Sequence, residues 1–290
     1  ILQSETDAVK HMGGTFYYGR RLGEDITISG LFDAGYGAVF LGIGCAEGAY
    51  LGLPDEDRTL KGYRNGIDFL LQCEKGVAVN NPPVFEGDVV VVGCGNVAMD
   101  CCRTAQRTAT GKVHVVYRRT IKEASADHEE IEAAEAEGVE FHFLTNPVAI
   151  VSENGEVTGV RVTKMELTEP DARGRRGVKA VPGSEFVIPC KTLIAAIGQK
   201  LERNVFSEAD GVQLDRRGNI SVTEALATSR PGVFAGGDCA TGPTTLIGGL
   251  SHGQRAADSI DEYLSRGSVG FVPRSRMGKL IRDCQLLEDD

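Results

Sequence analysis

Short apolar runs that end on or beside glycine recur along the chain. They occupy residues 38–41, 88–92, 193–198 and 233–238. Brief runs of this kind, bounded by turn residues, are typical of strands buried on both faces of a parallel sheet. The pattern therefore predicts an α/β fold, whereas the residues before 38 show no regular pattern.

The middle of the chain alternates strands with helices. After the strand at 88–92 the pattern predicts a helix at 96–108, a strand at 113–117, a helix at 126–137 and a strand at 139–144. This β-α-β-α-β order builds a parallel sheet with right-handed crossovers. Upstream, a short helix is expected at 66–74, and the Asn-Asn-Pro-Pro turn at 80–83 is a candidate domain boundary.

Beyond residue 144 the pattern changes to antiparallel pairing. An Asn-Gly turn at 154–155, between strands at 148–152 and 157–165, predicts a hairpin. A glycine- and arginine-rich loop at 173–176 is expected to be a solvated tip. A strand is expected at 185–189, and a long helix follows the last apolar run, from 245 to about 264.

Composition and charge exclude several classes of protein. The 290 residues carry 31 basic and 41 acidic side chains, a formal net charge of −10. This acidity argues against a nucleic-acid-binding protein, which normally presents a basic face. No apolar run approaches the ~20 residues of a membrane-spanning helix. No signal-peptide pattern stands at the start, so a cytoplasmic location is expected.

Eight cysteines are spread along the chain without a close pair of the CxxC type. Zinc sites, iron–sulfur sites and dithiol redox centres commonly use such pairs. The cysteines, including the adjacent Cys101 and Cys102, are therefore interpreted as small buried hydrophobes in a reducing compartment. No metal site is predicted.

The strand at 88–92 leads directly into a glycine-rich turn and then a helix. The first glycine allows the tight turn, the second lets the backbone approach a pyrophosphate, and the small Ala98 lets the helix pack against the strand. The helix N-terminus adds free N–H groups and a partial positive charge. Because the motif lies inside a β-α-β unit, it predicts dinucleotide binding rather than a purely structural turn. The residues assigned to the cofactor here are Gly93, Cys94, Gly95, Asn96 and Val97.

The end of the next strand predicts which coenzyme is bound. An acidic residue about 20 positions after the glycines would bind the ribose 2′-hydroxyl of NAD. This chain has Arg118 and Arg119 there instead. Guanidinium groups form strong bidentate bonds with phosphate, so NADP(H) is favoured over NAD(H). The alternative is a pair of arginines that are merely exposed at the strand end.

The run at 233–238 suggests a second ligand. Its strand ends at Asp238, whose carboxylate could accept a hydrogen bond from a sugar-like hydroxyl. The helix that begins near Thr245 would point its N-terminus at an electron-rich ring, as suits a reduced flavin. The alternative is an aspartate that only caps the turn. His252, on this helix, is assigned a surface or capping role rather than a catalytic one.

Five motifs together carry a family resemblance. They are VVGCGNVAMD at 91–100, VYRR at 116–119, AAIG at 195–198, GGD at 236–238 and TGPTTL at 241–246. With them the chain resembles the small (beta) subunit of NADPH-dependent glutamate synthase and its relatives, which are two-dinucleotide-binding flavoproteins. Each motif alone is unspecific, but the combination spans nearly the whole chain.

The resemblance implies a Rossmann-like NAD(P)-binding domain inserted into an FAD-binding domain of the pyridine nucleotide-disulfide oxidoreductase type. The implied boundaries are 1–84 for a partial FAD-binding domain and linker, 85–198 for the NAD(P)H-binding domain, and 199–290 for the rest of the FAD-binding domain. Gly237 and Asp238 would contact the flavin ribityl and pyrophosphate region. Thr245 and Leu246 would present N–H groups near the flavin ring. The remaining implied cofactor residues are Asp100, Ile197 and Gly198. Asp100 would face the nicotinamide, and the alternative is a carboxylate on the helix surface.

Members of this family begin with a cysteine-rich iron–sulfur segment and a first GxGxxG motif, and neither is found here. The chain is therefore expected to be a fragment with an incomplete FAD site. The implied activity is hydride transfer from NADPH to FAD, with electrons passing to an iron–sulfur or glutamate synthase large-subunit partner. No catalytic acid or base is assigned, because in this chemistry the cofactors carry the reactive steps. The alternative is a non-catalytic nucleotide-binding fragment or scaffold.

Overall fold

The structure, a computed structural model, describes residues 2–54, 56–170 and 176–269. The chain divides into two compact units, Ile1–Cys45 with Leu201–Asp290, and Ala46–Lys200. Residues 173–175 of the predicted arginine-rich loop and residues 270–290 of the third predicted domain lie outside the described residues.

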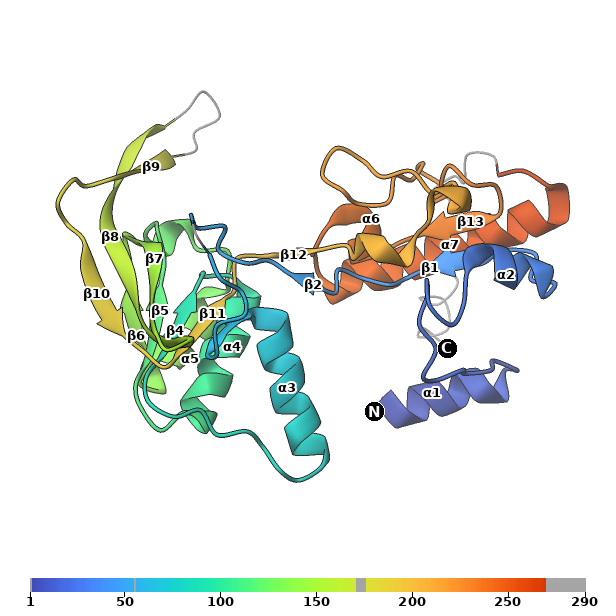
Figure 1. The fold of residues 1–290 in the computed structure, drawn as a ribbon. Coiled ribbons are helices and arrows are strands. Elements are labelled where there is room, and N and C mark those ends of the chain that lie inside the picture. The colour runs from blue at the N-terminus through green and yellow to red at the C-terminus, as the bar shows by residue number, and fades with distance from the viewer. Residues whose placement is uncertain (1, 55, 171–175, 270–290) are drawn as a thin grey trace, which may run out of the picture. The chain divides into compact units, whose positions relative to one another are not determined.

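The unit Ala46–Lys200 is built on a five-stranded parallel sheet (Figure 1). Its strands, in spatial order, are β3 (Tyr63–Asn65), β11 (Thr192–Ala195), β4 (Val89–Val92), β5 (Val113–Val116) and β6 (Glu140–His142). The helices of this unit are α3 (Gly66–Ala78), α4 (Asn96–Thr108) and α5 (His128–Ala136), and a 3₁₀ turn η1 spans Ile121–Glu123. All four strand pairs are parallel, which confirms the fold class that the strand–helix alternation predicted.

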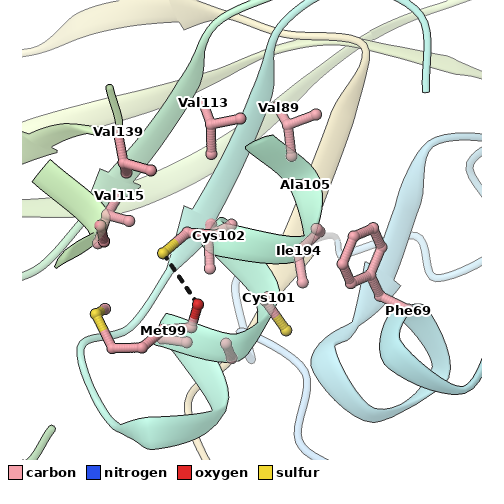
Figure 2. Packing of buried hydrophobic residues seen from close by; sticks show 14 of the residues in the cluster. Phe69, Val89, Met99, Cys101, Cys102, Ala105, Val113, Val115, Val139 and Ile194 are labelled. Atoms are coloured by element: carbon pink, nitrogen blue, oxygen red, sulfur yellow. Dashed lines mark hydrogen bonds between the residues drawn. The ribbon is translucent and has the colours of Figure 1, made fainter. Parts of the chain in front are cut away.

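One face of this sheet packs against α4, as Figure 2 shows. The helix contributes Met99, Cys101, Cys102 and Ala105, all essentially inaccessible to water. They lie against alternate valines of β4 and β5, and burial of a valine or methionine side chain in this core stabilises the fold by roughly 1.5–3 kcal/mol. The Cys102 thiol also donates a hydrogen bond to the Met99 carbonyl at 3.3 Å, drawn dashed in the figure.

The cysteines of this protein do behave as small buried hydrophobes. The seven that lie in the described part of the chain are all free and buried, and Cys284 lies outside it. Burial raises the pKa of several of their thiols, to about 12 for Cys102 and Cys190. These groups are therefore neutral at physiological pH and poorly nucleophilic.

The opposite face of the parallel sheet is covered by an antiparallel sheet. Its strands are β7 (Thr145–Glu153), β8 (Glu156–Pro170), β9 (Arg176–Ala180) and β10 (Phe186–Pro189). The β7–β8 hairpin turns at Asn154 and Gly155, both with positive φ, as the Asn-Gly signal predicted. Val157, Val160 and Val162 of β8 pack against Val90 and Val92 of β4 in one buried cluster.

This unit also takes in residues 46–84, upstream of the boundary predicted at residue 85. β3 pairs in parallel with β11, so the residues before the Asn-Asn-Pro-Pro turn complete the sheet. Helix α3 packs on the same core through Phe69 and Cys73. The short strands β2 (Glu47–Gly48) and β12 (Gln199–Lys200) pair with each other at the two points where the chain enters and leaves the unit.

The other unit has a two-stranded parallel sheet of β1 (Val39–Leu41) and β13 (Val233–Ala235). Its remaining elements are α1 (Leu2–His11), α2 (Ile28–Asp33), η2 (Arg203–Val205), η3 (Glu208–Asp210), α6 (Asp238–Thr241) and α7 (Leu246–Arg266). The core gathers Ile28, Leu201 and Ile220 around the two strands. The residues before 38 thus hold two helices where no pattern was recognised, because α1 is mostly polar and α2 has only six residues.

Candidate functional site

The turn between β4 and α4 can be made only by glycine at its first position. Gly93 has a φ of +131°, and a Cβ there would lie 2.2 Å from the carbonyl oxygen of Ala196. Its own N–H donates to the carbonyl of Val116 on β5 at 3.0 Å. The turn is therefore held between the ends of β11 and β5, as the first glycine of a phosphate-binding turn requires.

The first turn of α4 exposes backbone donors. Gly95 is the N-cap and offers no side chain, while its carbonyl accepts from the N–H groups of Ala98 and Met99. Among the described residues, no acceptor is recorded for the N–H groups of Asn96 and Val97. Ala98 is fully buried, which brings the helix close to the strand. A helix start with free donors and the positive end of the dipole is suited to an anion.

Cys94 connects this turn to the segment that follows β5. Its side chain is buried, and burial raises the pKa of its thiol to about 11. Its carbonyl accepts from the N–H groups of Ser125 and Ala126, at 3.1 and 3.2 Å. The segment after β5 is thus attached to the turn, and the Ser125 hydroxyl oxygen would lie 3.0 Å from a Cβ on Gly95. Ser125 was not predicted from the sequence, because no local pattern marks where a loop returns.

Arg118 and Arg119 follow β5 directly, at the edge of the sheet where the glycine turn also lies. Arg118 is exposed and Arg119 is half-buried. Within the described residues neither forms an ion pair, and the buried Nε of Arg119 has no hydrogen-bond partner. Burial raises the pKa of the neighbouring Tyr117, an effect that Arg119 partly offsets, and the Tyr117 hydroxyl donates to the Glu123 carbonyl at 2.6 Å. Among the described residues, these two cations therefore have no carboxylate partner beside the turn.

The other predicted residues of this unit lie on exposed backbone. Ile197 and Gly198 follow β11, where Ile197 is 46% exposed and Gly198 has a φ of +131°. The Gly198 carbonyl accepts from the N–H of Ala49 at 2.9 Å. Asp100 is exposed on α4. Their contact with a nicotinamide stays a prediction.

The second glycine turn, after β13, is partly satisfied by its own neighbours. The N–H of Gly237, whose φ is +70°, donates to Nδ1 of His252 at 2.9 Å. One carboxylate oxygen of Asp238 accepts from the N–H of Thr244 at 3.1 Å. The Cys45 thiol donates to the Asp238 carbonyl at 3.3 Å. His252 therefore has the capping role expected of it, with Nδ1 as the acceptor.

The start of α7 is apolar and exposed. Thr245 is the N-cap, and its hydroxyl accepts from the N–H of Gly248 at 3.3 Å. Leu246, Ile247 and Leu250 are 82%, 72% and 59% exposed. Whether the Thr245 and Leu246 amides face a flavin stays a prediction.

Comparison with known proteins assigns the family. The pattern of the pyridine nucleotide-disulphide oxidoreductase family matches residues 19–258. The chain belongs to this family. It is 43% identical to the beta subunit of an NADP⁺-dependent formate dehydrogenase of Moorella thermoacetica, over 93% of this chain and 37% of that protein. It is 36% identical to the small chain of the NADPH glutamate synthase of Escherichia coli K12, over 87% of this chain and 56% of that one.

The predicted resemblance to the glutamate synthase small subunit is thereby confirmed, and the chain spans about half the length or less of these relatives. Among solved structures, FprA of Mycobacterium tuberculosis in complex with NADPH aligns with a TM-score of 0.67 at 19% identity, over 90% of this chain and 71% of that one. This likeness supports the fold. Within residues 2–54, 56–170 and 176–269 of this chain, no helix is both long enough and apolar enough to span a bilayer.

Proposed function

We propose that the unit Ala46–Lys200 binds NADP(H) at the junction of β4 and α4. The pyrophosphate would lie against the N–H groups of Asn96 and Val97, and the 2′-phosphate against Arg118 and Arg119. The residues fit this ligand: the turn has no room for a Cβ at Gly93, and its helix presents free donors. The family assignment and the NADPH-named relatives support the same coenzyme.

The two guanidinium groups, which have no carboxylate partner among the described residues, carry the choice of NADP(H) over NAD(H). A half-buried arginine without a counter-ion is costly unless a ligand supplies one. The buried Arg119 Nε has no protein acceptor, so a phosphate at this strand end would satisfy it. No acidic side chain follows β5 at the position where one would bind a ribose 2′-hydroxyl.

The chain would act as the electron-input part of a larger oxidoreductase. FAD, when bound, would accept hydride from NADPH and pass single electrons on to an iron–sulfur or glutamate synthase large-subunit partner. The relatives that support this are named as subunits of a formate dehydrogenase and a glutamate synthase. The corresponding units are Ala46–Lys200 for NAD(P)H, and Ile1–Cys45 with Leu201–Asp290 for FAD, with the turn at Asp238 and the start of α7 facing the flavin.

This chain's own residues would position the coenzyme. The turn at Gly93 would fix the pyrophosphate, and the arginines would fix the adenosine end. The exposed Leu246, Ile247 and Leu250 offer an apolar surface from which a bound ring could displace water.

The deciding experiment compares NADPH and NADH binding by calorimetry in the wild type and in Arg118→Ala with Arg119→Ala. Each charged hydrogen bond contributes roughly 1.5–3 kcal/mol, so loss of two should weaken NADPH by about 100-fold or more and leave NADH nearly unchanged. Arg161→Ala removes an exposed arginine from β8 and serves as the matched control. An equal loss for both nucleotides would show that these arginines do not recognise the 2′-phosphate.

A further inference from the structure

A second polar cluster lies on neighbouring strands, on the sheet face away from α4. His114 of β5 and Glu140 and His142 of β6 bring their ligand atoms within 4.8 Å of one another. In the parallel register His114 lies opposite Glu140, and Val116 lies opposite His142. Val116 packs with the antiparallel sheet, and alternation along β5 places His114 on that same face.

Two of the three ligand–ligand distances in this cluster are those of donor atoms that share an ion, and the third, between Glu140 and His142, is within 4.8 Å. Nδ1 of His114 is 3.2 Å from Nε2 of His142 and 3.3 Å from a carboxylate oxygen of Glu140. Zinc bonds of about 2.0–2.1 Å in a tetrahedron place neighbouring ligand atoms roughly 3.3 Å apart. Imidazole nitrogens and a carboxylate are also the ligands that catalytic-type zinc sites use, with water in the open position.

His114 is the most deeply buried of the three side chains. This ring is buried, and its other nitrogen, Nε2, lies 3.9 Å from a carboxylate oxygen of Asp88. At 3.9 Å this contact is electrostatic rather than a hydrogen bond, and Asp88 is a neighbouring carboxylate of the kind that often supports a ligating histidine. Nδ1 of His114 faces Nε2 of His142 and a carboxylate oxygen of Glu140, and either a shared proton or a cation can lie among these three atoms.

The cluster is also reachable from solvent. The side chain of Glu140 is 44% exposed, and its other oxygen accepts from the Lys112 ammonium at 2.6 Å. His142 is only half-buried. Coordination by Glu140 would therefore use the oxygen that Lys112 does not hold.

We propose that His114, Glu140 and His142 form a binding site for a single Zn²⁺ ion, completed by water. The ion would link β5 to the edge strand β6, which has only three residues. The carbonyl of His142 accepts from the N–H of Tyr117 at 3.1 Å. The proposed metal ligand His142 is therefore bonded to the residue that directly precedes Arg118. The site uses none of the residues proposed to bind NADP(H), and the two proposals stand or fall separately.

Cysteine spacing could not reveal this site. The two histidines are 28 residues apart, and only the parallel register of β5 and β6 brings them together. The prediction that no metal site is present considered close cysteine pairs, and none of the three ligands here is a cysteine.

The test is a zinc titration of the full chain against a chromophoric chelator, with ZnCl₂ as the only added metal. The wild type should bind one equivalent, and His142→Gln and Glu140→Gln should each weaken binding by about tenfold or more, since even outer contacts to metal ligands are worth about 10–100-fold. His128→Gln, which removes an exposed histidine from α5, is the matched control and should bind as the wild type does. Circular dichroism confirms that each variant is folded.

Two further readouts locate the metal. Co²⁺ in place of Zn²⁺ should give the visible bands of a four-coordinate site without thiolate charge-transfer absorption, which excludes the cysteines as ligands. Saturating Zn²⁺ should raise the melting temperature of the wild type and of His128→Gln but not of His142→Gln. The proposal is overturned if the wild type binds no zinc more tightly than His142→Gln does, in which case the cluster holds only a shared proton. It is equally overturned if all variants bind alike or if thiolate bands are present.

Discussion

Two glycine turns of this protein follow a buried parallel strand, yet they differ in the groups around their free donors. After β4, the N–H groups of Asn96 and Val97 have no recorded acceptor among the described residues, and a helix of 13 residues begins at once. After β13, the N–H groups of Asp238 and Cys239 likewise have no recorded acceptor there, but Gly237 donates to His252, the Asp238 carboxylate stands at the first helical residue, and α6 has four residues. The comparison teaches that free donors at a strand–glycine–helix turn suit an anion best where a longer helix follows and no carboxylate stands beside them.

The largest expected effect is a loss of folding stability at the first turn. Two glycine substitutions distinguish the cost of a steric clash from the cost of backbone strain. Gly93→Ala should destabilise the fold by roughly 4 kcal/mol, because a strained φ costs about 1–3 kcal/mol and overpacking a similar amount. Gly198 has the same φ of +131° but no atom within 4 Å of a Cβ, so Gly198→Ala should cost only the strain, about 1–3 kcal/mol. Urea denaturation measures both, and equal losses would show that the contact with Ala196 is unimportant.

A smaller loss of stability is expected at the second turn, where the His252 side chain accepts a hydrogen bond from the backbone. His252→Ala removes the acceptor of the Gly237 N–H and should cost about 1–2 kcal/mol, since a poorly solvated donor is left unpaired. The loss should appear as a lower melting temperature with NADPH affinity unchanged. An unchanged melting temperature would mean that water replaces the imidazole at no cost.

The carboxylate of Asp238 should matter about as much as an ordinary helix cap. Asp238→Ala removes the acceptor of the Thr244 N–H and should cost about 1 kcal/mol, whereas Asp238→Asn keeps an acceptor and should cost less. Thermal denaturation of the two variants gives the difference. If Asp238→Asn is as unstable as Asp238→Ala, the contact depends on charge rather than on the hydrogen bond.

The smallest effect concerns the buried thiol beneath the first turn. Burial raises the pKa of Cys94 from 9.0 to about 11, so the folded protein holds this proton more tightly than the unfolded chain does. The stability that results is fully present below pH 9 and is lost as pH rises from 9 toward 11. At pH 8 the thiolate fraction should be about 100-fold below that of an unperturbed thiol of pKa 9.0, and mass spectrometry after iodoacetamide treatment should show slow labelling. Rapid labelling at pH 8 would contradict this burial.

Local signals were enough to predict the first turn. The helix expected at 96–108 is α4 (Asn96–Thr108), because the glycines before it and Gly111 after it mark its two ends. The helix expected at 126–137 starts later, at His128, since Asp127 is its N-cap and η1 occupies the residues before it.

What the sequence could not predict depends on distant pairing. Tyr63 of β3 lies opposite Leu193 of β11, so residues far apart in the chain share the sheet that the turn at 80–83 was expected to separate. Likewise, no local pattern indicates that Ser125 returns to the Cys94 carbonyl or that His252 caps Gly237. Such contacts arise from the closed fold, and they decide which backbone donors remain free.

The most direct test of the account follows the backbone amides while NADPH is added to ¹⁵N-labelled protein. The amide resonances of Asn96 and Val97 should shift in proportion to bound nucleotide, while that of Gly237, already paired with His252, should stay in place. Binding of NADPH that leaves Asn96 and Val97 unmoved, or no binding, would contradict the claim that the first turn holds the pyrophosphate.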